Sequence, residues 1–362
     1  MKRVLCLAVL VLGVIGGVSI AYGDQLKVAL FLPGNLGDMG FFDSAARGVT
    51  MAAEDLGIQY TIIEAGPDPA AWGPGLEDVA YGPYDVIITG APPMATHVER
   101  VAALLPDKHF ILFDTQVDYE RHPELTNVYS ILYKQNEGAF LAGALAALVT
   151  TSDMPKANPE PIIGFIGGQD YPIINDFLVG YIQGAQYINP AVKVLIAYAG
   201  TFSDPAKGKE LALAQYRAGA DVVFPAAAMT GLGALEAAKE VDKYAIGVDD
   251  DQALIFAEKL GDTETAEHIL SSALKKVDVS LFHALKLHMT GKLPYGQAEA
   301  WGIAEGAVGL ADNSIYRTHV PESFRKTLTE LEQKILAGEI VVRSAFGMAP
   351  QELDAMRQAV KP

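Results

Sequence analysis

The chain has 362 residues, half of them hydrophobic, and a formal net charge of −17 at pH 7. A surface with this excess of carboxylates repels phosphate backbones and anionic lipid head groups, so a nucleic acid partner and a peripheral membrane role are disfavoured. The length exceeds what a single hydrophobic core usually supports, so we expect two lobes.

The N-terminal residues have the pattern of an export signal. Lys2 and Arg3 precede an apolar run over 4–20, and small residues follow it up to Asp24. This pattern predicts a secretory signal peptide over residues 1–23, cleaved before Asp24. A retained membrane anchor is the alternative, but the run is short of the ~20 residues that a spanning helix needs. We therefore expect a periplasmic protein.

The single cysteine, Cys6, lies inside this predicted signal. A lipid anchor would need a cysteine at the cleavage point, so none is expected. The mature chain then has no thiol, which excludes disulfides, cysteine metal sites and cysteine nucleophiles. The fold must therefore be held by a large core.

Short β-branched runs alternate with alanine-rich segments of helical period along the rest of the chain. In the first half we expect strands near 26–32, 58–63, 84–89 and 109–113, and helices near 41–56 and 93–105. In the second half we expect strands near 128–132, 162–166, 192–198, 221–224, 244–248 and 269–275, and helices near 136–149, 173–187, 205–218, 230–240 and 322–336. This alternation predicts an α/β fold with two doubly wound lobes.

Five of these strands run into residues that can hold a small polar ligand. In chain order the residues are Asp38, Phe41, Asp114, Phe177, Asp249 and Lys275. In open parallel sheets, ligands bind beyond the carboxyl ends of the strands, where residues distant in sequence meet. The sequence therefore predicts a binding cleft.

Several motifs of the second half occur in a recognisable order. They are Gly164-Phe165-Ile166-Gly167-Gly168, Gly180-Tyr181, Asn189-Pro190, Gly200-Thr201-Phe202-Ser203-Asp204-Pro205, Gly219-Ala220-Asp221, Ile246-Gly247-Val248-Asp249, Lys275-Lys276-Val277-Asp278 and Gly309-Leu310-Ala311-Asp312-Asn313. Together they resemble the basic membrane protein (BMP) family. Its members are extracytoplasmic solute-binding components of ABC transporters, best known for binding purine nucleosides.

The resemblance implies a type I periplasmic-binding-protein fold, in which two α/β lobes joined by three hinge crossings close on a ligand. The expected N-terminal lobe is 24–135 plus about 272–295, and the C-terminal lobe is 136–271 plus about 296–362. A monomer is expected, and the resemblance implies a small-molecule solute, a nucleoside, and an ABC permease as partners. Neither enzymatic activity nor a cofactor or metal is implied.

The same resemblance assigns roles to the six residues at the strand ends. Phe41 and Phe177 match the aromatic pair that sandwiches the nucleobase, and stacking contributes roughly 1–3 kcal/mol per base. The polar contacts match Asp38, Asp114, Asp249 and Lys275. Carboxylates would accept the ribose hydroxyls in charge-assisted hydrogen bonds, and the lysine would offset their buried charge.

Five of these six residues also have a purely structural interpretation. The two phenylalanines would be core aromatics, as Tyr181 would be. Asp38 and Asp249 would cap helices, and Lys275 would be a solvated surface lysine. Trp72 lies in a segment rich in proline and glycine over 67–75, expected to be an exposed loop. There it would either line the cleft or pack on a lobe.

The family pattern is broken at positions that affect the choice of ligand. Phe42 stands where many relatives have asparagine, and Ala228-Met229 replaces a Gly-Gly pair, placing side chains where the backbone would approach the ligand. The segment 91–94 also departs from the usual glycine- and phenylalanine-containing loop. Riboflavin or a sugar therefore remains an alternative ligand to a nucleoside.

An enzyme is the alternative from another class. The run Asp249-Asp250-Asp251 is similar to the acidic calcium cluster of nucleoside hydrolases, but adjacent residues rarely converge on one ion. The sequence has no nucleophile elbow, zinc signature or phosphate loop. The seven histidines are scattered, without clear metal-ligand spacing.

Overall fold

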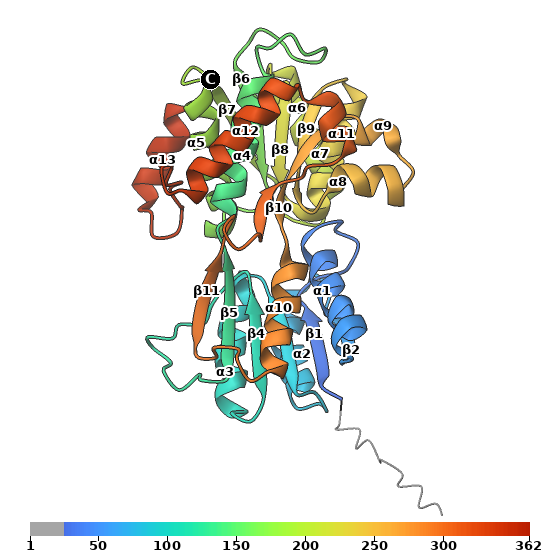
Figure 1. Ribbon diagram of the computed structural model, residues 1–362, viewed down its shortest axis with the longest axis vertical. Coiled ribbons are helices and arrows are strands. Elements are labelled where there is room, and N and C mark those ends of the chain that lie inside the picture. Colours follow the sequence, from blue (N-terminus) through green and yellow to red (C-terminus); the bar gives the residue numbers. More distant parts are fainter. Residues whose placement is uncertain (1–24) are drawn as a thin grey trace, which may run out of the picture.

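Two six-stranded sheets form two lobes, which lie one above the other along the long axis of the molecule (Figure 1). The structure is a computed structural model and describes residues 25–362. The predicted signal peptide and Cys6 lie outside the described residues. Within the described residues, every helix is too short or too polar to cross a membrane.

The first lobe contains the N-terminal elements. They are β1 (Lys27–Leu32), α1 (Phe41–Leu56), β2 (Gln59–Glu64), α2 (Pro69–Ala80), β3 (Val86–Gly90), η1 (Pro92–Met94), α3 (Ala95–Leu104), β4 (His109–Phe113) and β5 (Val128–Tyr133). The sheet order is β11-β5-β4-β3-β1-β2, with all neighbours parallel. The central strands are buried on both faces, which explains their continuous apolar sequences.

The second lobe follows the same plan. Its elements are α4 (Gln135–Val149), β6 (Ile162–Gly167), α5 (Pro172–Ile188), β7 (Lys193–Tyr198), α6 (Pro205–Arg217), β8 (Val222–Ala226), α7 (Ala228–Glu240), β9 (Tyr244–Asp249), α8 (Gln252–Leu254), η2 (Ile255–Lys259), α9 (Thr263–Ala266) and β10 (Ile269–Lys275). The sheet order is β12-β10-β9-β8-β6-β7, and only β12 is antiparallel to its neighbour. The predicted α/β fold with two doubly wound lobes is confirmed.

The C-terminal part of the chain visits both lobes. Its elements are α10 (Val277–Met289), β11 (Gln297–Trp301), β12 (Val308–Leu310), α11 (Ser314–His319), α12 (Glu322–Leu336) and α13 (Pro350–Ala359). Helix α10 packs on α1, and β11 pairs with β5 in the first lobe. Strand β12 pairs with β10, and α12 packs on α4 in the second lobe.

The chain therefore crosses between the lobes after β5, after β10 and after β11. This corrects the expected boundaries, because 272–275 belongs to the second sheet and 297–301 to the first. The sequence of β11, Gln-Ala-Glu-Ala-Trp, has little apolar content because it is an edge strand. Its pairing with β5 depends on tertiary structure. The sequence therefore predicted the second segment of the first lobe to end near residue 295, before β11.

The segment expected to be a loop over 67–75 is instead the start of α2. Pro69 stands in the first turn, where its missing N–H costs nothing, and the Asp68 carboxylate accepts a hydrogen bond from Ala70 N at 3.0 Å. Trp72 packs against the core of the first lobe, and its indole Nε1 donates to Gly66 O at 2.8 Å. Trp72 therefore packs on its lobe, and a place in the cleft stays a prediction.

Helices α4 and α5 pack unusually closely in the second lobe. A Cβ on Gly180 would collide with the carbonyl oxygen of Asn136, and one on Gly184 would collide with that of Phe140. Glycine is thus required at both positions for the two backbones to touch. This contact holds α5, which carries Phe177, beside the crossing that follows β5.

Candidate functional site

Lys275, the last residue of β10, is at the centre of a buried charged group between the lobes. Its side chain is 4% exposed, and its Nζ lies 3.0 Å and 3.1 Å from the two carboxylate oxygens of Asp114. The Oδ1 atom of Asp249 is 3.9 Å from the same Nζ. Asp114 follows β4 of the first lobe, whereas Asp249 and Lys275 end strands of the second. The ion pair therefore joins the two lobes.

Three aromatic rings surround the same ammonium group. The Nζ of Lys275 lies 4.9 Å from the ring centroid of Phe41, 5.2 Å from that of Phe177 and 5.7 Å from that of Tyr133. These distances are within the range of cation–π attraction. Phe41 belongs to α1 of the first lobe and Phe177 to α5 of the second. The structure thus brings the two predicted aromatics to one point, from opposite lobes.

Both phenylalanines also pack on their own lobes. The ring of Phe41 lies 5.3 Å from that of Phe113, and the ring of Phe177 lies 6.1 Å from that of Phe224. Phe177 is only 2% exposed. Each ring therefore has one side supported by a core aromatic, and both rings lie near Lys275.

Tyr133 is a member of this group that sequence reasoning missed. It ends β5 at the first crossing, and its hydroxyl lies 2.6 Å from Ser280 Oγ. Burial raises the pKa of Tyr133 well above its ordinary value. The available signal was its place at the end of a predicted strand, which is the same signal that identified the other residues.

The two aspartates that could cap helices behave differently. Asp38 accepts hydrogen bonds from the backbone N–H groups of Gly40, Phe42 and Asp43, at 3.1, 2.8 and 3.2 Å. Both of its oxygens therefore hold the start of α1, which is the capping interpretation. The Oδ1 of Asp249 is buried and has no hydrogen-bond partner among the described residues. Asp249 therefore keeps a free acceptor beside Lys275.

Burial raises the pKa of Asp114 and of Asp249 to about 6, while the nearby charge of Lys275 opposes the rise. The negative charge of Asp114 also raises the pKa of Asp249. A buried carboxylate with raised pKa and spare hydrogen-bonding capacity is typical of a functional site. A ligand hydroxyl donating to Asp249 would favour its ionised form.

The backbone at this edge of both sheets is strained. Residues with left-handed φ are Met39 (51°), Ala91 (75°), Asp114 (62°), Ala228 (47°) and Asp249 (66°). Asp249 ends β9, Ala91 and Asp114 directly follow β3 and β4, and Met39 and Ala228 lie in the connections that follow β1 and β8. Strained conformations of residues other than glycine cluster at ligand sites, because the surrounding structure must impose them. The strain therefore marks the same edge that the side chains mark.

The remaining candidates lie around this group. The ring of Phe42 lies 5.1 Å from that of Phe41 and packs against Gly34, where it leaves no room for a Cβ. Met229 is half-buried in the first turn of α7, beside the strained Ala228. Neither side chain is among the rings and carboxylates that surround Lys275. Their place at the strand ends leaves them as predicted ligand neighbours.

The acidic run after β9 is divided among separate partners. Asp250 Oδ2 lies 2.6 Å from Arg47 Nη1, and the Arg47 Nε lies 2.7 Å from Asp278 Oδ2. The carboxylate of Asp251 accepts two hydrogen bonds from Asn313 Nδ2, at 2.7 and 2.9 Å. In residues 25–362, no cluster of three or more His, Cys, Asp or Glu has the geometry to hold a metal ion. Arg47 instead links α1 to the second lobe.

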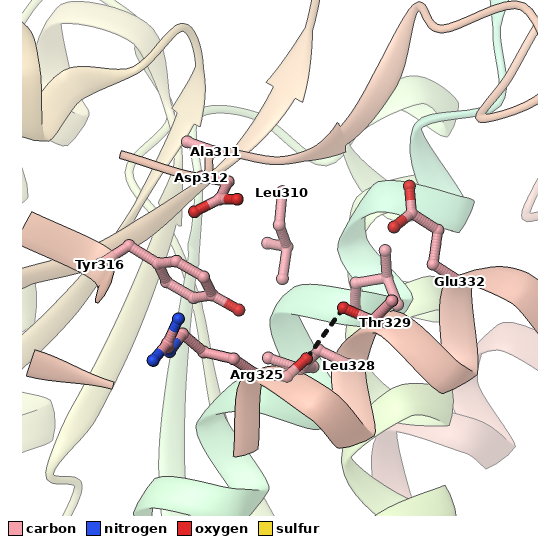
Figure 2. Close-up of a pocket in the computed structure, with 9 residues that line it drawn as sticks. Leu310, Ala311, Asp312, Tyr316, Arg325, Leu328, Thr329 and Glu332 are labelled. Atoms are coloured by element: carbon pink, nitrogen blue, oxygen red, sulfur yellow. Dashed lines mark hydrogen bonds between the residues drawn. The ribbon is translucent and has the colours of Figure 1, made fainter. Parts of the chain in front are cut away.

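A separate pocket of about 170 Å³ lies in the second lobe (Figure 2). Leu310, Tyr316 and Arg325 line it, between β12, α11 and α12. The Tyr316 hydroxyl points into its centre, and Leu310 covers it from the strand side (Figure 2). This pocket is distinct from the group around Lys275.

Two parallel α/β lobes, three crossings and a buried group where the strand ends face each other define a two-lobed solute-binding protein of the type I periplasmic-binding fold. The family described as "Bmp: ABC transporter substrate-binding protein PnrA-like" matches residues 25–345. The chain therefore belongs to this family of ABC transporter substrate-binding proteins, as the sequence motifs predicted.

Known proteins similar to this chain agree with that membership. Basic membrane protein D of Borreliella burgdorferi is 30% identical, over 88% of each chain. The ABC transporter nucleoside-binding protein BmpA of Lactococcus lactis is 34% identical, over 66% of this chain and 65% of its own. A solved ABC transporter solute-binding protein from Aeropyrum pernix has a TM-score of 0.79 and 27% identity, covering 93% of this chain and 100% of its own.

Proposed function

We propose that this protein is the extracytoplasmic receptor of an ABC importer and that it binds a nucleoside between its lobes. The observation that carries the proposal is the placement of Phe41 and Phe177, from opposite lobes, around one buried lysine. A nucleoside has a flat apolar base and a polar diol, and the group offers aromatic rings and carboxylates together. The name of the Lactococcus lactis relative supports the same class of ligand.

In this proposal the base inserts between the two phenylalanine rings. Stacking on an aromatic side chain contributes roughly 1–3 kcal/mol per base. The ribose hydroxyls donate to the free Oδ1 of Asp249 and to Asp114, while Lys275 donates to a sugar or base oxygen. Lys275 also keeps the two carboxylates ionised, because its positive charge opposes the effect of burial on their pKa.

The lobes close because only the closed arrangement brings both rings and all polar groups to the ligand. The ion pair of Arg47 with Asp250 joins the lobes and stabilises that arrangement from outside the site, while Asp278 of α10, in the same lobe as Arg47, holds the guanidinium group. The closed form then docks on the membrane permease. Residues 1–23 would direct export, and the receptor would act as a monomer.

The test is calorimetric titration of refolded, ligand-stripped protein with adenosine, guanosine, inosine, uridine, riboflavin and ribose. We expect a nucleoside to bind most tightly, with Phe41→Ala as the matched variant that weakens binding without removing a charge. Preference for riboflavin or ribose would assign a different solute. Absence of binding to every compound would contradict the solute class.

A nucleoside hydrolase would need its acidic residues to be available for a metal ion or a water molecule. Asp250 and Asp251 are instead paired with Arg47 and Asn313. Incubation of the protein with the same nucleosides, followed by chromatography for free base, should show no release. Release of many equivalents of base per protein molecule would favour the enzyme.

A further inference from the structure

The segment between α12 and α13 contacts α4 and α5 of the second lobe. We call residues 342–345 the C-terminal arm. The side chain of Asn136 donates to the carbonyls of Val342 at 3.0 Å and Arg343 at 3.3 Å. Gln183 of α5 makes two hydrogen bonds to the backbone of Arg343, both at 3.0 Å. The arm is therefore fixed to α4 and α5 together.

Asp176 is the point where the arm, α4 and α5 meet. It is 1% exposed, and its Oδ1 accepts hydrogen bonds from Ser344 Oγ at 2.6 Å and Ala345 N at 2.8 Å. Its Oδ2 accepts from Asn136 N at 3.3 Å. A buried carboxylate with three donors is strongly held, because charge-assisted hydrogen bonds are about twice as strong as neutral ones.

The positions of these partners connect Asp176 to ligand binding. Phe177, one residue later in α5, is the second-lobe ring beside Lys275. Asn136 is in the first turn of α4, directly after the crossing from β5, which ends at Tyr133. A displacement of Asp176 would therefore move the ring of Phe177 and the hinge segment between β5 and α4.

The arm is anchored beyond its end as well. The Arg357 Nη2 of α13 lies 2.8 Å from Asp170, Asn175 and Tyr198. Val194 N, on the outer strand β7, donates to Val360 O at 2.8 Å. The arm thus lies between two fixed helices, α12 and α13, so that it cannot relax freely when Asp176 is changed.

We propose that Asp176 is a positioning residue, and that it uses the C-terminal arm to hold Phe177 and the first hinge crossing in the arrangement that binds ligand. This inference rests on the proposed function, because Phe177 is its link to the ligand. The C-terminal arm would then contribute to binding without contacting the ligand, since none of its residues is among those that surround Lys275.

The experiment compares Asp176→Asn, Ser344→Ala and the control Ser323→Ala. Asn keeps the size of Asp176 but has no charge and turns an N–H group toward other donors. Ser344→Ala removes one hydroxyl and is the variant that will fold if Asp176→Asn does not. Ser323 is exposed on α12, so its substitution matches the chemistry of Ser344→Ala away from the arm.

The readouts are the Kd for adenosine and guanosine at 25 °C and the Tm of ligand-free protein. In a folded variant whose binding arrangement is less populated, the apparent Kd rises in inverse proportion to the populated fraction. We expect Kd to rise ~10-fold in Asp176→Asn and ~3-fold in Ser344→Ala, with Ser323→Ala unchanged.

Two results would contradict the inference. If Asp176→Asn and Ser344→Ala lower the Tm but leave Kd unchanged, Asp176 only stabilises the fold. If Ser323→Ala raises Kd as much as Ser344→Ala, the effect is not specific to the arm. Failure of the wild-type protein to bind either nucleoside would be a different outcome, since it contradicts the proposed function.

Discussion

The start of α1 and the end of β9 each present a buried aspartate at the interface of the lobes, yet the two serve different purposes. Asp38 is 2% exposed and Asp249 is 8% exposed, and burial raises the pKa of both to about 6. Asp38 accepts three backbone hydrogen bonds, whereas Oδ1 of Asp249 has no partner among the described residues.

This difference shows that burial and a raised pKa do not by themselves identify a ligand-binding carboxylate. Asp38 satisfies its own hydrogen-bonding capacity by holding a helix start, which stabilises the fold. Asp249 has capacity left over, which only a ligand or a water molecule can use. Spare capacity is therefore the better criterion, and we expect substitutions at the two positions to separate affinity from stability.

The largest effect should come from removing the free acceptor. We expect Asp249→Ala to raise the Kd for the bound nucleoside ~100-fold, because a charge-assisted hydrogen bond is lost in a buried site. Asp250→Ala, the neighbouring control, should change it less than ~5-fold. Calorimetric titration measures both, and equal losses would remove the basis for assigning Asp249.

Removal of a stacking ring should have the next largest effect. Phe177→Leu is expected to raise Kd ~30-fold, because the base loses an aromatic face while the core keeps an apolar side chain. The control is Tyr181→Phe, which deletes a buried hydroxyl without a described partner and should leave Kd unchanged. If both variants bind like wild type, Phe177 is a core residue alone.

The pH dependence of Asp249 has opposite signs for stability and for binding. Its folded pKa of about 6 is above the ordinary 3.8. The free energy of unfolding of the ligand-free protein should therefore fall as the pH rises from about 3.8 to about 6, because ionising the buried carboxylate costs more in the folded state than in the unfolded state. The stability of Asp249→Asn relative to wild type should therefore rise between pH 4.5 and 7.5, by roughly 2 kcal/mol. Wild-type affinity should fall as the pH drops below about 6, because the acceptor is protonated.

Thermal denaturation and titration at the same pH values measure these two trends. A stability difference between Asp249→Asn and wild type that is independent of pH would show that the carboxylate is not buried in its ionised form. Asp38→Asn, measured beside it, shows how much of any trend is shared by a carboxylate of similar burial.

Asp38→Ala should mainly affect stability. Loss of the bonds to the start of α1 is expected to lower the free energy of unfolding by ~1–2 kcal/mol, with Kd changed less than ~3-fold. Asp68→Ala is the matched control, because Asp68 caps α2 of the same lobe. A loss of affinity for Asp38→Ala near that of Asp249→Ala would restore Asp38 as a direct ligand contact.

The smallest effect concerns the strained backbone at the same edge of the first sheet, after β3. Ala91 has φ 75° and ψ 149°, a conformation that glycine adopts with far less strain. Ala91→Gly should raise the free energy of unfolding by up to ~1 kcal/mol, whereas Ala103→Gly in helix α3 should lower it by a similar amount. Chemical denaturation of both variants measures the difference, and destabilisation by Ala91→Gly would refute the strain.

Much of the fold was predictable because its signals are local. The apolar run ending at Lys275 and the helical period over 322–336 agree with the observed elements. The start of α2 was missed because Pro69 and Pro74 were interpreted as loop residues, although one occupies the first turn. Strand β11 was missed because an edge strand carries a weak pattern.

The candidate site was only partly predictable. The residues at strand ends were found because parallel strands deliver them to one edge, and Tyr133 was missed although it shares that placement. The distinction between Asp38 and Asp249 needed coordinates, because it depends on which backbone N–H groups lie within reach. The use of Asp176 as a junction could not be predicted, since its partners are 40 and more residues away.

The sequence by itself determined the α/β class, the order of the central strands and helices, and the family, because these follow from local periodicity and from motifs along the chain. The tertiary structure decided where the crossings fall, which carboxylate keeps a free oxygen, and which rings surround Lys275. The physical reason is that hydrogen bonds and burial depend on distances between residues far apart in sequence, and only the folded chain sets those distances.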